Sequence, residues 1–200
     1  MPEQLPSVVI VMGVSGSGKS TIGSLLAGRL RWEFEDGDWF HPAANVDKMH
    51  KGIPLTDDDR GPWLRSIRAW IDRTHREGGH GVIACSALKR RYRAVLIGDR
   101  AETRLVYLKG SEGLIARRIA TRHEHFMPPS LLHSQFAALE EPRADENPIT
   151  ISIEPRPSEI VAQILSALNA GETAAPAAST ARGSSGPAPT AHPGGSQPES

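Results

Sequence analysis

The residues most capable of chemistry stand at positions 13–20, where the chain reads Gly-Val-Ser-Gly-Ser-Gly-Lys-Ser. This order matches the Walker A pattern G-x-x-x-x-G-K-[ST] at every required position. Glycines let backbone N–H groups turn around phosphate oxygens, Lys19 can reach the β- and γ-phosphates, and Ser20 can ligate Mg²⁺. The alternative is a glycine-rich turn that happens to precede a helix. The predicted nucleotide-binding residues are Gly13, Ser15, Gly16, Ser17, Gly18, Lys19, Ser20 and Thr21.

Two carboxylates follow the next short apolar segment, in the sequence Asp36-Gly37-Asp38. Phosphoryl transfer needs a carboxylate that faces the acceptor hydroxyl. We expect Asp38 to orient or deprotonate that hydroxyl, as a catalytic residue beside Lys19, and Asp36 to help hold Mg²⁺, through water. If the strand stays extended, residues two apart point to the same side. The alternative is an ordinary Asp-Gly-Asp turn at the end of a strand.

The elements that must position these groups follow from apolar patterning. Short apolar runs predict strands over 8–12, 33–36, 82–85, 104–108 and 149–153. Helical spacing predicts helices over 19–31, 43–51, 56–77, 88–97, 111–122 and 128–139, and a last one marked by Ile160, Ile164 and Leu168. This alternation predicts a three-layer α/β fold with a five-stranded parallel sheet flanked by helices, and the Walker A pattern makes it a P-loop fold. Ligands should then lie at the carboxyl ends of the strands.

Composition separates the chain into two parts. Residues 170–200 contain no aromatic residue and no aliphatic residue larger than Ala, which predicts a disordered tail. Residues 1–169 are expected to form one compact α/β domain that carries the P-loop. Lys and Arg together number 23, equal to Asp and Glu, so charge gives no support for a nucleic-acid or membrane partner. Cys85 is the only cysteine, and the N-terminus lacks the features of a signal peptide, so we expect a cytoplasmic protein.

Several segments together are more specific than the Walker A pattern. They read MGVSGSGKST, DGDWFHPAANVDKMHKGIPLTDDDRGPWL, CSALKRRYR, RHEHFMPPSLLHSQF and LEEP, and they run from residue 12 to about 142. In this combination the chain resembles the gluconate kinase family of P-loop small-molecule kinases. Residues 95–100 depart from the family pattern, and the tail is not part of it.

The resemblance implies ATP- and Mg²⁺-dependent phosphorylation of D-gluconate at its 6-hydroxyl, by a homodimer. It also implies a lid segment over about 118–135. Within that segment Arg122 would meet the transferring phosphoryl group as a catalytic residue, and Arg118 would contact the nucleotide. The alternative for both arginines is a positive charge that complements the end of a helix dipole.

The same resemblance assigns a sugar-acid pocket. Arg60, Lys89 and Arg93 are the cationic candidates for the gluconate carboxylate. The alternatives are a solvated basic helix face for residues 89–93, and for Arg60 an ordinary pairing with Asp57 or Asp58. The residues expected to contact substrate hydroxyls, although a histidine can be purely structural, are Asp38, His41, His125 and Gln135.

Two other functions compete with this interpretation. One is a different small-molecule kinase on the same scaffold, of the shikimate or nucleotide type. The third strand here leads into Cys-Ser-Ala-Leu-Lys instead of the glycine-rich turn of the shikimate type, which argues against that function. The other is a non-catalytic nucleotide-binding module, which the presence of Lys19, Ser20, Asp36 and Asp38 argues against.

Overall fold

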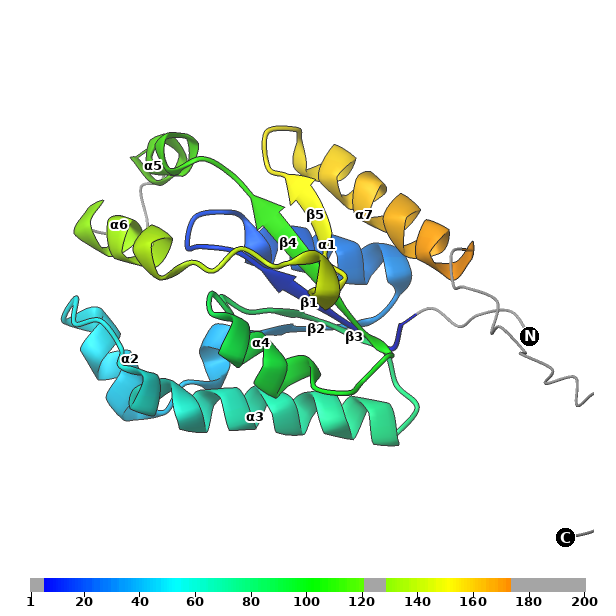
Figure 1. Cartoon of the computed structure of the whole chain (residues 1–200), viewed down its shortest axis with the longest axis horizontal. Coiled ribbons are helices and arrows are strands. Elements are labelled where there is room, and N and C mark those ends of the chain that lie inside the picture. Colours follow the sequence, from blue (N-terminus) through cyan, green and yellow to red (C-terminus); the bar gives the residue numbers. More distant parts are fainter. Residues whose placement is uncertain (1–5, 121–128, 174–200) are drawn as a thin grey trace, which may run out of the picture.

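A computed structural model of the chain describes residues 6–120 and 129–173. Its centre is a parallel sheet with the strand order β2-β3-β1-β4-β5 (Figure 1). β1 is buried along its whole length, as expected of a parallel strand covered on both faces. The five strands are β1 (Val8–Met12), β2 (Glu33–Asp36), β3 (Gly81–Ala84), β4 (Thr103–Lys109) and β5 (Ile149–Ser152).

Helices cover both faces of the sheet, which confirms the predicted three-layer architecture. α1 (Lys19–Leu30) and α7 (Pro157–Thr173) pack together on one face, and α3 (Asp57–Arg76) and α4 (Arg90–Ile97) lie on the other (Figure 1). β1 contributes alternate side chains to both cores: Val9 and Val11 to the first, Ile10 to the second. The remaining helices are α2 (Ala43–His50), α5 (Glu112–Ala120), α6 (Pro129–Ala138) and the 3₁₀ helices η1 (Gly37–Phe40) and η2 (Ala144–Glu146).

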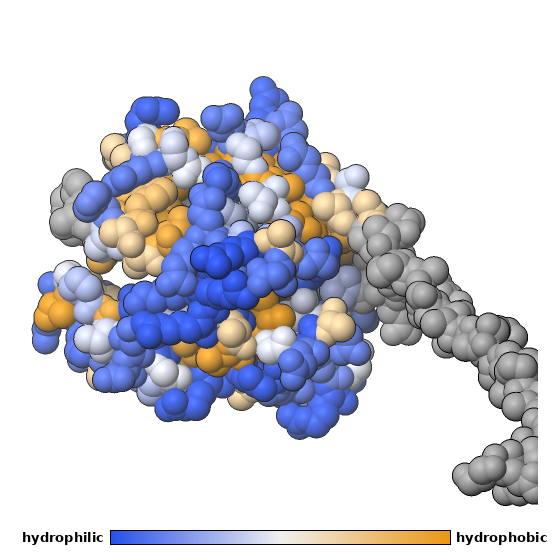
Figure 2. Space-filling model, in the orientation of Figure 1, coloured by the Kyte–Doolittle hydropathy of each residue, from blue (hydrophilic) through white to orange (hydrophobic). Residues whose placement is uncertain are grey.

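The carboxyl ends of the strands point to one side of the molecule. The loop after β1, the helix η1 after β2 and the segment between β3 and α4 therefore meet there, as predicted from the alternation of elements. In Figure 2 the surface is hollowed at this side, between α6 above and α2 below. The functional site is built around these strand ends.

Two sequence-based expectations need correction. The chain does not stay extended beyond β2, because Asp36 caps η1 and residues 37–40 form a 3₁₀ helix. Asp36 and Asp38 are thus not related as neighbours on one face of a strand. The kinase domain also extends beyond residue 169, since α7 continues to Thr173. Composition alone placed Ala170 in the tail, although Ala is the strongest helix former. Residues 174–200 lie outside the described residues.

Local signals explain how α3 begins. Thr56 Oγ1 accepts a hydrogen bond from the backbone N–H of Asp59, and the Asp59 carboxylate accepts one from the backbone N–H of Thr56. This capping box confirms the predicted helix start at Thr56, and three acidic residues in the first turn complement the helix dipole.

In the part of the chain that the structure describes, no helix is long and apolar enough to span a membrane.

Candidate active site

The loop between β1 and α1 has the backbone conformation that its glycines predict. Gly16 and Gly18 have φ values of 82° and 96°, which residues with a side chain rarely adopt. Lys19 opens α1, and its Nζ donates a hydrogen bond to the Val14 carbonyl at 3.2 Å, across the loop. The loop therefore places a lysine and a helix N-terminus at one point, which suits a phosphate group.

The two carboxylates of the Asp-Gly-Asp segment lie beside this loop. The Ser20 hydroxyl donates to Asp36 Oδ2 at 2.6 Å, and the backbone N–H of Asp38 donates to Asp36 Oδ1 at 3.0 Å. Burial lowers the pKa of Lys19, and the negative charges of Asp38 and Asp36 oppose that shift. Gly37 allows this close arrangement, since a Cβ there would stand 2.5 Å from the Ala84 carbonyl oxygen.

The geometry suits the predicted division of labour between these residues. A hydroxyl and a carboxylate are hard oxygen donors of the kind that Mg²⁺ accepts together with phosphate oxygens. Among the described residues there is no group of three or more His, Cys, Asp or Glu that could hold a metal by themselves. The Ser20 hydroxyl and the Asp36 carboxylate, 2.6 Å apart beside the phosphate loop, suit a Mg²⁺ ion that arrives with a nucleotide. The Asp38 side chain is exposed, and within the described ranges no donor contacts its carboxylate.

His41 connects η1 to the helices below the sheet. Its ring stacks on Trp63 with centroids 4.5 Å apart, and Trp63 Nε1 donates to the Gly37 carbonyl at 2.7 Å. The Asn45 amide nitrogen lies 3.3 Å from His41 Nδ1, so Nδ1 accepts and the ring proton stands on Nε2. Burial lowers the pKa of His41; Asp38 opposes the shift and Arg60 adds to it. His41 is thus a neutral donor positioned between an acidic and a basic group.

A cluster of charged groups lies where the N-terminal ends of α3 and α4 approach each other. Lys89 Nζ donates to Asp57 at 3.1 Å, and the Arg91 guanidinium and the Tyr92 hydroxyl donate to the same carboxylate. These donors hold the pKa of Asp57 well below its usual range. The Arg60 guanidinium stands 5.8 Å from the centre of the Tyr92 ring. We call these five residues the acceptor-side cluster.

Arg60 does not form the ordinary ion pair that was its alternative interpretation. Its Nη1 donates to backbone carbonyls of Leu55 and Thr56 at the start of α3. In residues 6–120 and 129–173 it pairs with neither Asp57 nor Asp58. Its charge therefore remains available to an anionic ligand, unlike that of Lys89, which is shared with Asp57.

Arg93 requires a correction. Its side chain is 1% exposed, and its Nε and Nη2 donate to Glu146 at 2.6 and 2.9 Å. Its Nη1 donates to the carbonyls of Ala87, Leu88 and Glu140. The guanidinium is therefore committed to the protein, and the structure does not bring it to the substrate side. It instead fastens the segment between β3 and α4, which carries Lys89, to the chain before β5.

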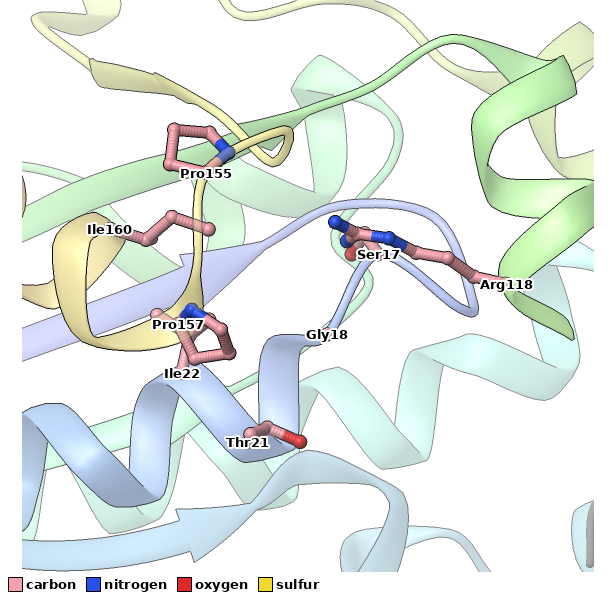
Figure 3. A pocket seen from close by; sticks show the side chains of 8 residues that line it. All are labelled: Ser17, Gly18, Thr21, Ile22, Arg118, Pro155, Pro157 and Ile160. Carbon is pink, nitrogen blue, oxygen red and sulfur yellow. The ribbon is translucent and has the colours of Figure 1, made fainter. Parts of the chain in front are cut away.

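Gln135 lies elsewhere than expected, whereas Arg118 lies beside the phosphate loop. Gln135 on α6 does not face the acceptor side: its amide bonds to Ser15 in the phosphate loop. Arg118 on α5 donates to the Ile153 carbonyl at 2.5 Å and reaches over the loop near Ser17 (Figure 3). Arg122 and His125 lie outside the described residues, so their predicted roles stay predictions.

A pocket opens between the phosphate loop and the segment that joins β5 to α7 (Figure 3). Two prolines and Ile160 form its apolar wall, and Arg118 lies on the opposite side. A flat apolar wall facing a guanidinium suits the stacking of a nucleotide base. Arg118 thus lines a pocket next to the phosphate loop, and its contact with the nucleotide stays a prediction. The lining residues are Ser17, Gly18, Thr21, Ile22, Arg118, Pro155, Pro157 and Ile160.

Fold and site together define a small P-loop kinase, and comparison with known proteins agrees. Residues 15–169 match the family model described as shikimate kinase. A solved shikimate kinase from Aquifex aeolicus is only 16% identical, with a TM-score of 0.55, so it supports the fold alone.

Much more similar relatives narrow the class. The chain is 48% identical to a gluconokinase of Gluconobacter oxydans over 161 residues, which cover 80% of this chain and 90% of that one. It is 44% identical to a probable gluconokinase of Mus musculus over 182 residues, which cover 82% of this chain and 99% of that one. A solved gluconokinase from Sinorhizobium meliloti is 41% identical with a TM-score of 0.76, covering 85% of this chain and 95% of that one. The chain belongs to the gluconokinase family, as the sequence resemblance predicted.

Proposed function

We propose that the protein transfers the γ-phosphoryl group of ATP to the 6-hydroxyl of D-gluconate and releases 6-phospho-D-gluconate and ADP. The observation that carries this proposal is the 48% identity to a gluconokinase across most of both chains. The site supports it, because a phosphate loop, a magnesium-type donor pair and an exposed carboxylate meet at the ends of β1 and β2. A cytoplasmic location and the homodimer expected from the resemblance belong to the same proposal.

The chemistry is an in-line displacement on the γ-phosphorus. The oxygen of the 6-hydroxyl forms a bond to phosphorus, the bond to the β–γ bridging oxygen breaks, and the hydroxyl proton passes to Asp38. Lys19 offsets the negative charge that develops on the phosphate oxygens. Ser20, and Asp36 through water, would hold Mg²⁺, which would supply positive charge to offset that of the phosphates.

The acceptor side then selects the sugar acid. The carboxylate of gluconate lies at the opposite end of the molecule from its 6-hydroxyl, so a cation is needed away from Asp38. Arg60 meets that need with bidentate donors, and Lys89 adds a point charge. The Nε2 proton of His41 suits a hydrogen bond to a substrate hydroxyl between these two ends. Arg122 and His125 remain candidates for the phosphoryl group and a hydroxyl.

The direct test is ADP release from ATP and Mg²⁺ with a panel of acceptors. D-gluconate should stimulate release strongly, while glucose, shikimate, AMP and close epimers of gluconate should stimulate it weakly. Stimulation by another acceptor would overturn the assignment of the substrate but keep the kinase mechanism. Nucleotide binding without acceptor-dependent release would overturn the catalytic function itself.

A further inference from the structure

Gln135 joins α6 to the phosphate loop through both ends of its side-chain amide. Its Oε1 accepts from the Ser15 backbone N–H at 2.7 Å, and its Nε2 donates to the Ser15 hydroxyl at 3.0 Å. The two residues are 120 positions apart in the sequence. Opposite polarities at the two bonds fix the orientation of the amide and of the Ser15 hydroxyl together.

The surroundings of this contact are closely packed. Gly16, the next loop residue, lies against α5: a Cβ there would stand 2.8 Å from an Ile119 side-chain carbon. Leu132, one turn before Gln135 on α6, is 4% exposed and belongs to the same core as α1 and α7. α5 and α6 therefore rest directly on the phosphate loop, on the same side of the molecule (Figure 1). The two hydrogen bonds of Gln135 therefore form where α6 is closely packed against the phosphate loop.

The bonds matter because the loop binds phosphate through its backbone. Its N–H groups can converge on an anion only while the peptide planes keep their orientation. The Ser15 peptide lies between Val14 and Gly16, and Gly16 has the wide conformational freedom of glycine. A neutral amide acceptor satisfies the Ser15 N–H without adding a negative charge that would repel phosphate.

We propose that Gln135 is a positioning residue for the nucleotide: it holds the Ser15 peptide in its phosphate-binding orientation and thereby couples α6 to the loop. This role replaces the predicted contact with a substrate hydroxyl. The positioning role of Gln135 rests on the proposed function in one respect, namely that the nucleotide is ATP. A residue that acts through Ser15 changes nucleotide affinity and leaves acceptor affinity unchanged.

The test is titration of MgADP and a non-hydrolysable MgATP analogue into three variants without acceptor, followed by steady-state kinetics. Gln135→Leu removes both bonds and should weaken both nucleotides about tenfold. Ser15→Ala removes only the hydroxyl bond and should weaken them about threefold. Gln135→Glu keeps an acceptor but brings a charge to the loop, so it should weaken the ATP analogue more than ADP. The KM for D-gluconate should stay within about twofold of the original throughout.

Ser134→Ala is the matched control, because Ser134 is an exposed neighbour on α6 whose hydroxyl donates only within its own helix. A thermal melt verifies that each variant is folded. If Gln135→Leu does not fold, the nucleotide affinity of Ser15→Ala still tests the proposal. Unchanged nucleotide affinity with a raised gluconate KM would overturn the proposal in favour of a hydroxyl contact. Tighter nucleotide binding in Gln135→Leu would overturn it as well, since Gln135 would then compete with phosphate. Because binding is measured without acceptor, failure of the gluconate assay would leave this result standing.

Discussion

The donor side and the acceptor side of this site are built in different ways. On the donor side, one continuous stretch of eight residues provides the phosphate loop, mostly through its backbone. On the acceptor side, side chains from η1, α3 and α4 come together, and none of these segments adjoins another in the chain. The donor side therefore depends on local conformation. The acceptor side depends on how well distant elements are held in place, and buried Arg93 is one residue that holds them.

The largest effect on the donor side should come from Lys19. Lys19→Met removes the positive charge that faces the phosphates and should lower kcat about 100- to 1,000-fold. Lys51→Met, on the exposed end of α2, serves as the control and should leave kcat unchanged. Steady-state kinetics at saturating ATP and gluconate would check this. A kcat within threefold of the original would show that the loop lysine is not needed for transfer.

Arg93 should affect stability instead of substrate binding. Arg93→Leu leaves the Glu146 charge buried without its partner, which should cost about 3–5 kcal/mol in the free energy of unfolding. Arg90 pairs with Asp145 at the surface of the same helix, where solvent screens the pair, so Arg90→Leu should cost far less than Arg93→Leu. Urea unfolding of the two variants would compare them. Equal stability with a raised gluconate KM would return Arg93 to the substrate.

Arg60 should show the opposite behaviour. Arg60→Ala removes the charge that we propose binds the substrate carboxylate, so it should raise the gluconate KM about tenfold and leave the KM for ATP unchanged. Arg65→Ala, an exposed arginine one turn along α3, is the control. If both variants had the original gluconate KM, the carboxylate would have to bind elsewhere, and Lys89 would be the next candidate.

The smallest expected effect concerns acid. Hydrogen bonds from Tyr92, Lys89 and Arg91 lower the pKa of Asp57 in the folded state. A carboxyl group with a lowered folded-state pKa contributes stability above its unfolded pKa of about 4, and that contribution is lost as the pH falls further. Asp57→Asn should therefore lose less thermal stability between pH 7 and pH 3 than the original protein. Asp58→Asn is the control, and a drop equal to that of the original protein would contradict the assignment.

The same contrast explains what sequence could predict. Lys19, Ser20 and the glycines follow from a contiguous pattern whose conformation is local, and the strands follow from apolar runs, since each signal lies within a few residues. Arg93 and Gln135 stand in family-like segments, and that position predicts contact with the substrate. Their partners, Glu146 and Ser15, lie 53 and 120 residues away, and no local pattern records such distances.

Residues that sequence analysis missed are of the same kind. The Tyr92 hydroxyl reaches the Asp57 carboxylate only because α3 and α4 pack on one face of the sheet. The sequence alone does not indicate this contact, although Tyr92 lies three residues after Lys89. Sequence analysis also misses the turn into η1. The residue that caps this helix is Asp36, which the sequence predicts only as a magnesium ligand.

Asp38 stands between the two sides, and we propose that it orients and deprotonates the acceptor hydroxyl. The most direct measurement is kcat with D-gluconate for Asp38→Asn, together with the affinity for MgATP, with the exposed Asp47→Asn as control. We predict that kcat falls about 100- to 10,000-fold while MgATP affinity stays within about threefold. A near-normal kcat would contradict the account, because the hydroxyl would then need no carboxylate at the end of β2.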